Sequence, residues 1–392
     1  MSTTPPSPMV AGPRKAIVKA LLWSRVVWLA LRCHRSPRRA AQALQALLAE
    51  RARHRLGVTL KYARAGGRYF WDFYSPGWPS PAFDRFVERE LDRLLPQHGA
   101  PHGLQTAIVA VTKRCPLRCE HCCEWQALNQ QETLSREDLL QIVAQLAERG
   151  VAQILLSGGE PLQRFDDVVA IVAAAAGETD FWLLSSGHGL TAERAAQLRS
   201  AGLTGIALSL DHHDPESHDR FRRFPGAFAG VERAAASARG AGLLVALSLC
   251  PTRAFVSEEN LAAYARVARQ LGAAFVQILE PQAVGHYAGQ DVALSAAQRR
   301  LLEEFCIRLN FDPARRELPA VAYAGFSRRR TGCHGAGERY LYVDTDGALL
   351  PCPFCREPAG SVLAEGLDAP LAALRARGCP AQARDPQAAG PR

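Results

Sequence analysis

Short apolar runs rich in Val, Ile and Leu recur along the chain from residue 104 onward, and each is followed by a segment with helical periodicity. Six such runs are present, at 106–111, 153–157, 181–186, 205–211, 244–249 and 275–281. Three of the intervening segments begin with a helix-capping hydroxyl, at Ser135, Thr191 and Ser257. Apolar strands that alternate with helices are typical of parallel βαβ units buried on both faces. The pattern predicts an α/β fold with a partial (β/α)6 TIM-like barrel over 104–312.

The first 103 residues follow a different pattern. An apolar run at 16–31 precedes a second expected helix, which Ser36 caps and Gly57 ends. Residues 58–73 then alternate around Gly66 and Gly67, as in a β-hairpin, and another helix begins after Ser80. We expect a mixed helical and hairpin accessory region without catalytic residues.

The run at 16–31 is too short, and with Lys19 and Arg25 too charged, to span a bilayer. Residues 1–70 hold fourteen Lys or Arg and one acidic residue, a net charge of +13, so the other 322 residues sum to −4 of the overall +9. A basic helix that carries Trp23 and Trp28 could lie on an anionic membrane surface. Packing of the same helix against the barrel is the alternative. We expect a cytoplasmic protein, with peripheral contact at the inner membrane face if the first alternative holds.

The eleven cysteines are odd in number and clustered, and no cleavable signal sequence precedes them, which favours metal sites in a reducing compartment. The densest cluster, "CPLRCEHCC", begins three residues after the first strand and places thiols at Cys115, Cys119 and Cys122. Three thiolates on one loop can hold three irons of a cubane cluster and leave the fourth iron open to substrate. Zinc is the alternative occupant.

The second strand ends in "SGGEPL", where Gly158 and Gly159 allow close approach to the backbone and Glu160 adds a carboxylate. In parallel α/β folds the ends of successive strands face one mouth. The cysteine loop after strand one, together with "GGEP" after strand two, resembles the radical S-adenosylmethionine (radical SAM) superfamily. The resemblance extends over residues 106 to about 375.

This resemblance implies roles for individual residues. Cys115, Cys119 and Cys122 would ligate a 4Fe-4S cluster whose open iron takes the amino and carboxylate groups of SAM, while Gly158, Gly159 and Glu160 would receive the methionine amino group. Further cofactor-binding candidates are Ser185 and Ser186, then Ser209 and Asp211 at the end of the fourth strand. Arg222 is expected to pair with the SAM carboxylate, and Arg220 and Arg223 are alternatives.

Two residues of the cysteine loop stand outside this set. His121 occupies the position where relatives usually carry an aromatic residue beside the adenine of SAM, and a metal ligand is its alternative role. Cys123 has no counterpart in the family motif, so we interpret it as a spare thiol.

The C-terminal region carries a second group of cysteines, with the spacing Cys333-x13-Gly347-x4-Cys352-x2-Cys355-x23-Cys379. Residues 343–350 suggest a tight turn between two short strands. The four thiols resemble the auxiliary-cluster extension called SPASM, or twitch in its short form, over 313–380, which implies a second 4Fe-4S cluster; structural zinc is the alternative. Residues 381–392 are expected to form a disordered tail. Cys33, Cys250 and Cys306 stand alone and are interpreted as buried thiols.

The resemblance implies that a reducing partner of flavodoxin or ferredoxin type delivers an electron, and that SAM is cleaved to methionine and a 5′-deoxyadenosyl radical that abstracts hydrogen from a substrate. We expect peptide or protein modification or natural-product biosynthesis. The alternatives are a lipid or small-molecule substrate at a membrane surface and, in a different class, a non-catalytic cluster or zinc scaffold. Nucleic acid is not favoured, because the basic residues lack an interleaved stacking platform.

Overall fold

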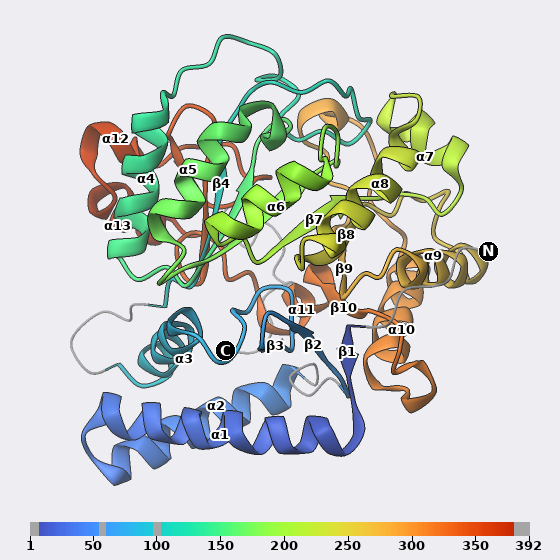
Figure 1. The fold of residues 1–392 in the computed structure, drawn as a ribbon. Coiled ribbons are helices and arrows are strands. Elements are labelled where there is room, and N and C mark those ends of the chain that lie inside the picture. Colours follow the sequence, from blue (N-terminus) through green and yellow to red (C-terminus); the bar gives the residue numbers. More distant parts are fainter. Residues whose placement is uncertain (1–7, 55–59, 97–102, 380–392) are drawn as a thin grey trace.

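The computed structural model describes residues 8–54, 60–96 and 103–379, and its centre is a curved, mainly parallel sheet (Figure 1). All six predicted strands are present, in the order of the chain, and neighbouring strands pair in parallel. They are β4 (Thr106–Ala110), β5 (Gln153–Ser157), β6 (Asp180–Ser185), β7 (Gly205–Ser209), β8 (Leu244–Leu249) and β9 (Phe275–Ile278). The predicted partial barrel is therefore confirmed.

Helices cover the outer face of the sheet because their apolar stripes meet the outward-facing strand residues in one core. They are α4 (Arg136–Glu148), α5 (Phe165–Ala175), α6 (Ala192–Ala201), α8 (Ala227–Gly240), α9 (Glu258–Gln270) and α10 (Ala296–Phe311). The short α7 (Pro215–Arg222) precedes α8 and buries only His218 and Arg222. The side chains of Ser135, Thr191 and Ser257 accept hydrogen bonds from the first turns of α4, α6 and α9, as the sequence predicted.

The C-terminal region extends both edges of the sheet. β10 (Ala320–Tyr323) pairs in parallel with β9, and after α11 (Ala324–Thr331) the chain crosses to the other edge, where β11 (Tyr340–Val343) pairs in parallel with β4. β12 (Leu349–Leu350) returns antiparallel to β11, so the predicted turn between two short strands is confirmed. Two helices, α12 (Val362–Glu365) and α13 (Asp368–Arg377), follow. The predicted tail at 381–392 lies outside the described residues.

The N-terminal hairpin fills the bottom of the barrel. β2 (Tyr62–Ala65) and β3 (Arg68–Phe70) confirm the predicted hairpin, and β1 (Met9–Val10) adds a third strand. Phe70 and Phe73 are fully buried against Trp182 and Phe275 and against small residues on the inner face of the sheet. Alanines at these inner positions leave the space that the aromatic rings fill. The accessory region thus closes the end of the barrel where the strands begin.

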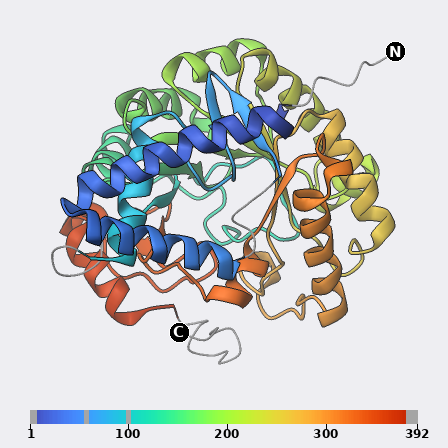
Figure 2. The same ribbon diagram turned by 90° about the horizontal axis from the view of Figure 1, so that it is seen from below.

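α1 (Gly12–His34) and α2 (Pro37–His54) form the outermost layer at this end (Figure 2), and α3 (Pro81–Leu94) lies between them and the barrel (Figure 1). α1 is longer than the predicted 16–31 at both ends, and its buried residues pack on α2 and α3, not directly on the barrel strands. Trp23 is half-buried in this cluster, whereas Trp28 is exposed. Within the described residues, no helix has both the length and the apolar character needed to cross a membrane.

Candidate active site

The three-cysteine loop leaves the end of β4 and runs over the top of the barrel in the view of Figure 1. Cys119 is buried, and Cys115 and Cys122 are half-buried. Burial, together with the charges of Glu160 and Cys119, raises the pKa of Cys115 to about 12. Burial and the nearby Cys123, Cys119 and Cys115 also raise the pKa of Cys122. The three thiols therefore lie within electrostatic range of one another, as ligands of one cluster must.

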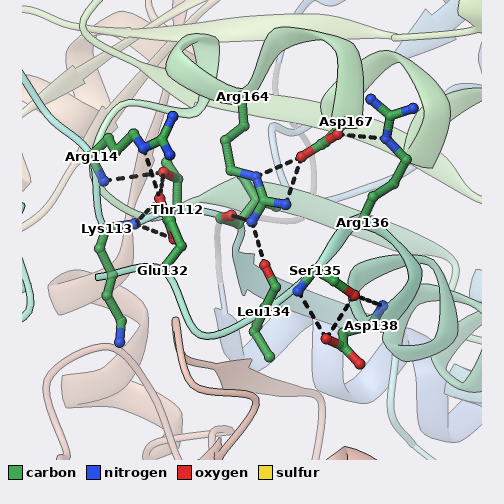
Figure 3. Close-up of polar contacts among 11 residues, drawn as sticks. Thr112, Lys113, Arg114, Glu132, Leu134, Ser135, Arg136, Asp138, Arg164 and Asp167 are labelled. Carbon is green, nitrogen blue, oxygen red and sulfur yellow. Dashed lines mark hydrogen bonds and ion pairs between the residues drawn. The ribbon is translucent and has the colours of Figure 1, made fainter. Parts of the chain in front are cut away.

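A polar network fixes the entry to this loop (Figure 3). The Glu132 carboxylate accepts hydrogen bonds from the Thr112 hydroxyl and from the backbone N–H of Lys113, at 3.1 and 3.2 Å for the latter. Arg164 donates to the carbonyl oxygens of Val111 and Leu134 and pairs with Asp167. The strand end is thereby tied to the segment that returns toward α4.

Asn129 closes the loop from the other side. Its side chain accepts from the Cys115 N–H at 2.9 Å and donates to the Cys115 carbonyl at 3.0 Å, while its backbone N–H donates to Lys113 at 2.7 Å. Asn129 has a φ of +58°, a conformation that Asn tolerates better than most residues. The side chain of Asn129 thus fixes Cys115 between the end of β4 and the segment that leads to α4.

The paired glycines let the strand-two loop approach the cysteine loop. A Cβ at Gly158 would lie 2.6 Å from the Thr112 carbonyl oxygen, and one at Gly159 would fall on the Arg114 carbonyl oxygen. The N–H groups of Gly159 and Glu160 donate to Thr112 and Arg114, both at 2.7 Å. These two amides are therefore used within the protein, and the glycines serve close backbone approach. A role for them in receiving the SAM amino group stays a prediction.

Glu160 is almost completely buried and its carboxylate is held by the loop after β6. Ser185 donates through its hydroxyl at 2.7 Å, Ser186 through its backbone N–H at 2.8 Å, and Leu162 through its N–H at 3.2 Å. Burial raises the pKa of Glu160, although these hydrogen bonds act in the opposite direction. Ser185, predicted from sequence as a cofactor contact, thus orients Glu160.

Arg222 lies in the centre of the site. It forms an ion pair with Asp211 at 2.5 Å and donates to the Cys119 sulfur at 3.5 Å. Burial opposes its charge, but Asp211 and Cys119 outweigh burial and raise the pKa of Arg222. Arg220 and Arg223 are both exposed. Of the three predicted arginines, Arg222 is the one that the fold brings to the cysteine loop.

Asp211 is oriented from two strands. It accepts from the Cys250 N–H at 2.9 Å, and its own N–H donates to His218. Burial would raise the pKa of Asp211, but the charge of Arg222, the neighbouring histidines and the Cys250 hydrogen bond together outweigh burial and lower this pKa. Burial also lowers the pKa of His218 to about 4, so this imidazole is neutral at physiological pH.

A cavity of about 730 Å³ opens beside these groups. Its lining includes Leu117 of the cysteine loop, Ser186, Ser209 and Arg222. The Arg222 Nε is buried and has no hydrogen-bond partner within the described protein. An unsatisfied guanidinium N–H at a cavity wall suits an incoming carboxylate.

His121 stacks on Phe221, with ring centroids 4.9 Å apart and planes tilted by 20°. Burial lowers its pKa to about 4, and its Nδ1 is buried with no protein partner among the described residues. A neutral, flat ring in this position agrees with the aromatic role expected from the sequence.

The C-terminal cysteines gather into a second cluster. Cys379 hydrogen-bonds with Cys333 and with Cys355, and Cys355 hydrogen-bonds with Cys352. Cys352 and Cys379 are buried. No three His, Cys, Asp or Glu side chains of the described chain close on a single metal ion. The ligands of a four-iron cluster are arranged differently from those of a single ion. Each iron takes one thiolate, so four thiols must surround the whole cluster.

An ion pair between the buried Glu124 and the exposed Arg356 connects the two cysteine groups. Glu124, just after Cys123, accepts hydrogen bonds from Tyr342 and from Arg356, both at 2.6 Å. Arg356 directly follows Cys355 and also donates to the Cys123 carbonyl oxygen. The cysteine loop and the C-terminal extension are therefore packed as one unit.

A short 3-10 helix, η2 (Gly285–Tyr287), docks on the cysteine loop from the β9 side. The His286 N–H donates to the Cys122 carbonyl at 2.9 Å, and its Nδ1 lies 3.0 Å from the Cys119 carbonyl oxygen. The His286 ring stacks on Trp125 with centroids 3.9 Å apart. A Cβ at Gly285 would fall on the Cys122 carbonyl oxygen, so only glycine permits this approach.

The isolated cysteines behave as expected, with one correction. Cys250 and Cys306 are buried, but Cys33 is half-buried, because it lies near the end of α1 on the exposed layer. Sequence reasoning missed Glu124, Asn129, Glu132, His286 and Arg356. Of these, Glu124 and Arg356 adjoin cysteines in sequence, and the others carry no local signal.

Comparison with known proteins agrees with this geometry. Residues 109–268 match the model of the Radical SAM superfamily. The chain is 31% identical to the PqqA peptide cyclase of Methylocella silvestris over 269 residues, which covers 64% of this chain and 68% of the cyclase. Identity to the PqqA peptide cyclase of Streptomyces rochei is 32%, over 66% of this chain and 71% of that protein. The chain belongs to the radical SAM superfamily.

Solved structures show the same fold. Streptococcus suis SuiB bound to S-adenosylmethionine superposes with a TM-score of 0.54 at 16% identity, over 68% of this chain and 64% of SuiB. SuiB bound to the precursor peptide SuiA gives a TM-score of 0.56 at 15% identity, over 72% of this chain and 68% of SuiB. This radical SAM enzyme binds a 4Fe-4S cluster and SAM, and the donors gathered at its barrel mouth fit both: three thiols, a buried carboxylate and an unsatisfied guanidinium.

Proposed function

We propose that this radical SAM enzyme modifies a ribosomally made peptide or a protein. The observation that carries the site assignment is the convergence of Cys119, Arg222 and Asp211 beside the cavity, with Glu160 and Cys115 in electrostatic range. When bound, the cluster supplies an electron for the reductive cleavage of SAM. The residues of the chain bind, orient and shield the reactants.

Each residue has a definite task in this proposal. Cys115, Cys119 and Cys122 hold the cluster. Glu160, which Ser185 and Ser186 keep in one orientation, receives the amino group of SAM. Arg222 receives the carboxylate, because it has an unsatisfied N–H and is itself fixed by Asp211. Ser209 lies on the cavity wall and contacts the cofactor.

The C-terminal thiols hold an auxiliary 4Fe-4S cluster in this proposal. Its ligands are Cys333, Cys352, Cys355 and Cys379, which already lie within hydrogen-bond contact of one another in a chain. Four thiolates complete the coordination of a cubane. The Glu124–Arg356 pair fixes its distance from the first cysteine loop. An electron donor of flavodoxin or ferredoxin type serves the enzyme.

The choice of substrate rests on the relatives. Two of them are PqqA peptide cyclases, and SuiB has been captured with the precursor peptide SuiA. A lipid or small-molecule substrate is the weaker candidate, because none of the similarities reported above points to one.

Co-expression tests this assignment. Each short open reading frame that flanks the gene is expressed with the wild-type enzyme and, as a matched control, with Cys122→Ala. We expect one peptide to change in mass with the wild-type enzyme alone. The peptide assignment is overturned if no peptide changes while lipids or small metabolites accelerate SAM cleavage by the purified enzyme.

A further inference from the structure

The outward face of α1 is an apolar stripe. Seven large hydrophobic side chains are exposed in the described part of the chain, and five of them belong to this helix. These five, between 41% and 63% exposed, are Ile17, Leu21, Val27, Trp28 and Leu31. At 3.6 residues per turn the five positions fall within an arc of about 120° on one side of the helix, opposite the side that packs on α2 and α3.

The surroundings of this stripe are strongly basic. Residues 8–54 contain ten Lys or Arg and a single acidic residue, Glu50. Glu50 pairs with Arg93 and Arg339 and so is directed into the molecule. The exposed basic residues of α1, α2 and the turn between them are Arg14, Arg32, Arg35, Arg38 and Arg39. Of the acidic groups of α3 that face α1, Asp84 and Glu88 are engaged with Arg25 and Arg32, and Asp92 lies within electrostatic range of Cys33 and His34 at the end of the helix.

We propose that the outward face of α1 binds a bilayer that contains anionic lipids. A helix with an apolar stripe and a basic rim lies in the plane of the interface, with its apolar side chains at the boundary between headgroups and acyl chains. Trp28 is suited to this boundary, because its indole lies between the guanidinium groups of Arg25 and Arg32, at 4.1 and 4.9 Å from the ring centroid.

Charge favours the bilayer over a second copy of α1. The exposed positions 17, 21, 24, 28 and 31 also have the spacing of a coiled-coil seam. However, a seam between two copies of α1 would oppose basic residues to basic residues. Anionic phosphate headgroups, in contrast, complement the basic residues that flank the apolar stripe of α1.

The position of α1 sets the orientation of the bound enzyme. α1 lies at the end of the barrel where the strands begin, whereas the cysteine loop lies at the opposite end (Figure 1). A bilayer on α1 therefore leaves the mouth facing the aqueous side, open to a water-soluble substrate. The membrane contact is thus independent of the substrate proposed above.

Sedimentation of the cluster-loaded full-length enzyme with vesicles tests the proposal. The vesicles contain either phosphatidylcholine alone or phosphatidylcholine with phosphatidylglycerol. We expect binding to the anionic vesicles only, weakening as salt is raised. The double variant Leu21→Glu/Trp28→Glu should bind on the order of tenfold or more weakly, since it loses apolar contacts and gains two negative charges.

The control is Ile307→Glu, which places a glutamate on a similarly exposed apolar site of α10 and adds one negative charge where the α1 variant adds two. It should bind like the wild type. Visible absorption and the melting temperature establish that each variant is folded and loaded with iron. The proposal is overturned if the wild type does not bind anionic vesicles, if the α1 variant binds as well as the control, or if the α1 variant only converts a dimer to a monomer.

Discussion

Glu160 and Arg222 are the two charged side chains that define the chemistry of the mouth. Both are buried, and each is held by partners from a different part of the chain: Glu160 by the loop after β6, and Arg222 by Asp211 at the end of β7. Burial of charged groups is unfavourable unless they are paired or hydrogen-bonded. In the function proposed above, these two side chains receive the two charged ends of the amino-acid part of SAM.

Replacement of Arg222 by lysine should weaken SAM binding while iron is retained. The lysine keeps a positive charge beside Asp211, whereas Arg222→Ala would leave that carboxylate buried and unpaired. A single ammonium cannot replace the planar guanidinium toward Asp211, Cys119 and a ligand carboxylate, so we expect a loss of about ten- to a hundredfold in SAM affinity. Calorimetric titration measures it. Arg220→Lys, on the exposed side of α7, is the control, and equal affinity in the two variants would remove Arg222 from the SAM site.

SAM binding should also depend on pH through Glu160. Burial raises the pKa of this carboxyl, so it takes up a proton at a higher pH than an exposed glutamate, whose pKa is about 4.3. The ionised form is needed to receive an ammonium group, and SAM affinity should therefore fall as the pH drops through the raised pKa. Titrations at several pH values below neutrality measure the effect. Glu160→Gln should bind weakly and lose this dependence; the same pH profile in wild type and variant would contradict the assignment.

At the scale of elements, the sequence predicted what depends on local pattern. The six strands, the hairpin and the capped helices follow from apolar runs, glycines and capping hydroxyls, and all are present. The docking of η2 on the cysteine loop could not be predicted, because Gly285 and His286 lie more than 150 residues from the cysteines that they contact. The Glu124–Arg356 pair is likewise formed across 232 residues. Only the closed barrel brings these segments together.

Gly285→Ala should loosen the first cluster. The added Cβ would fall on the Cys122 carbonyl oxygen, so η2 must move away and release its contacts with the cysteine loop. We expect lower iron content after anaerobic reconstitution and faster loss of visible absorption with a chelator.

Gly289→Ala provides the matched control. Gly289 also has a positive φ, of +76°, but nothing lies within 4 Å of its Cβ position. The backbone penalty of about 1–2 kcal/mol is therefore common to both variants, and the clash is specific to Gly285. If the two variants retain iron equally, η2 does not support the cluster.

On the scale of the whole molecule, the N-terminal region closes one end of the barrel and leaves the other end for chemistry. The sequence predicted an accessory region but not its place, because the rings of Phe70 and Phe73 look like ordinary hairpin residues until the small inner residues of β7, β8, β9 and β10 are seen around them. Arg68 and the Gly77 N–H, which both bond to Asp180, anchor the segment at the start of β6.

Phe73→Ala should destabilise the barrel itself. The ring is fully buried against Trp182 and Phe275, and its removal leaves a cavity that the rigid strands cannot fill. We expect a loss of about 3–5 kcal/mol in the free energy of unfolding, measured with urea. Leu48→Ala, at an exposed site of α2, should cost far less. Equal costs for the two variants would show that the hairpin is only an appendage.

The central claim is that the site at the barrel mouth cleaves SAM. Its most direct test is the formation of 5′-deoxyadenosine by anaerobically reconstituted, reduced enzyme supplied with SAM. We predict 5′-deoxyadenosine from the wild type and none from Cys119→Ala. That variant should retain about half of the iron if, as proposed, the C-terminal cysteines hold a second cluster. Absence of 5′-deoxyadenosine from the fully iron-loaded wild type under several reductants would contradict the account.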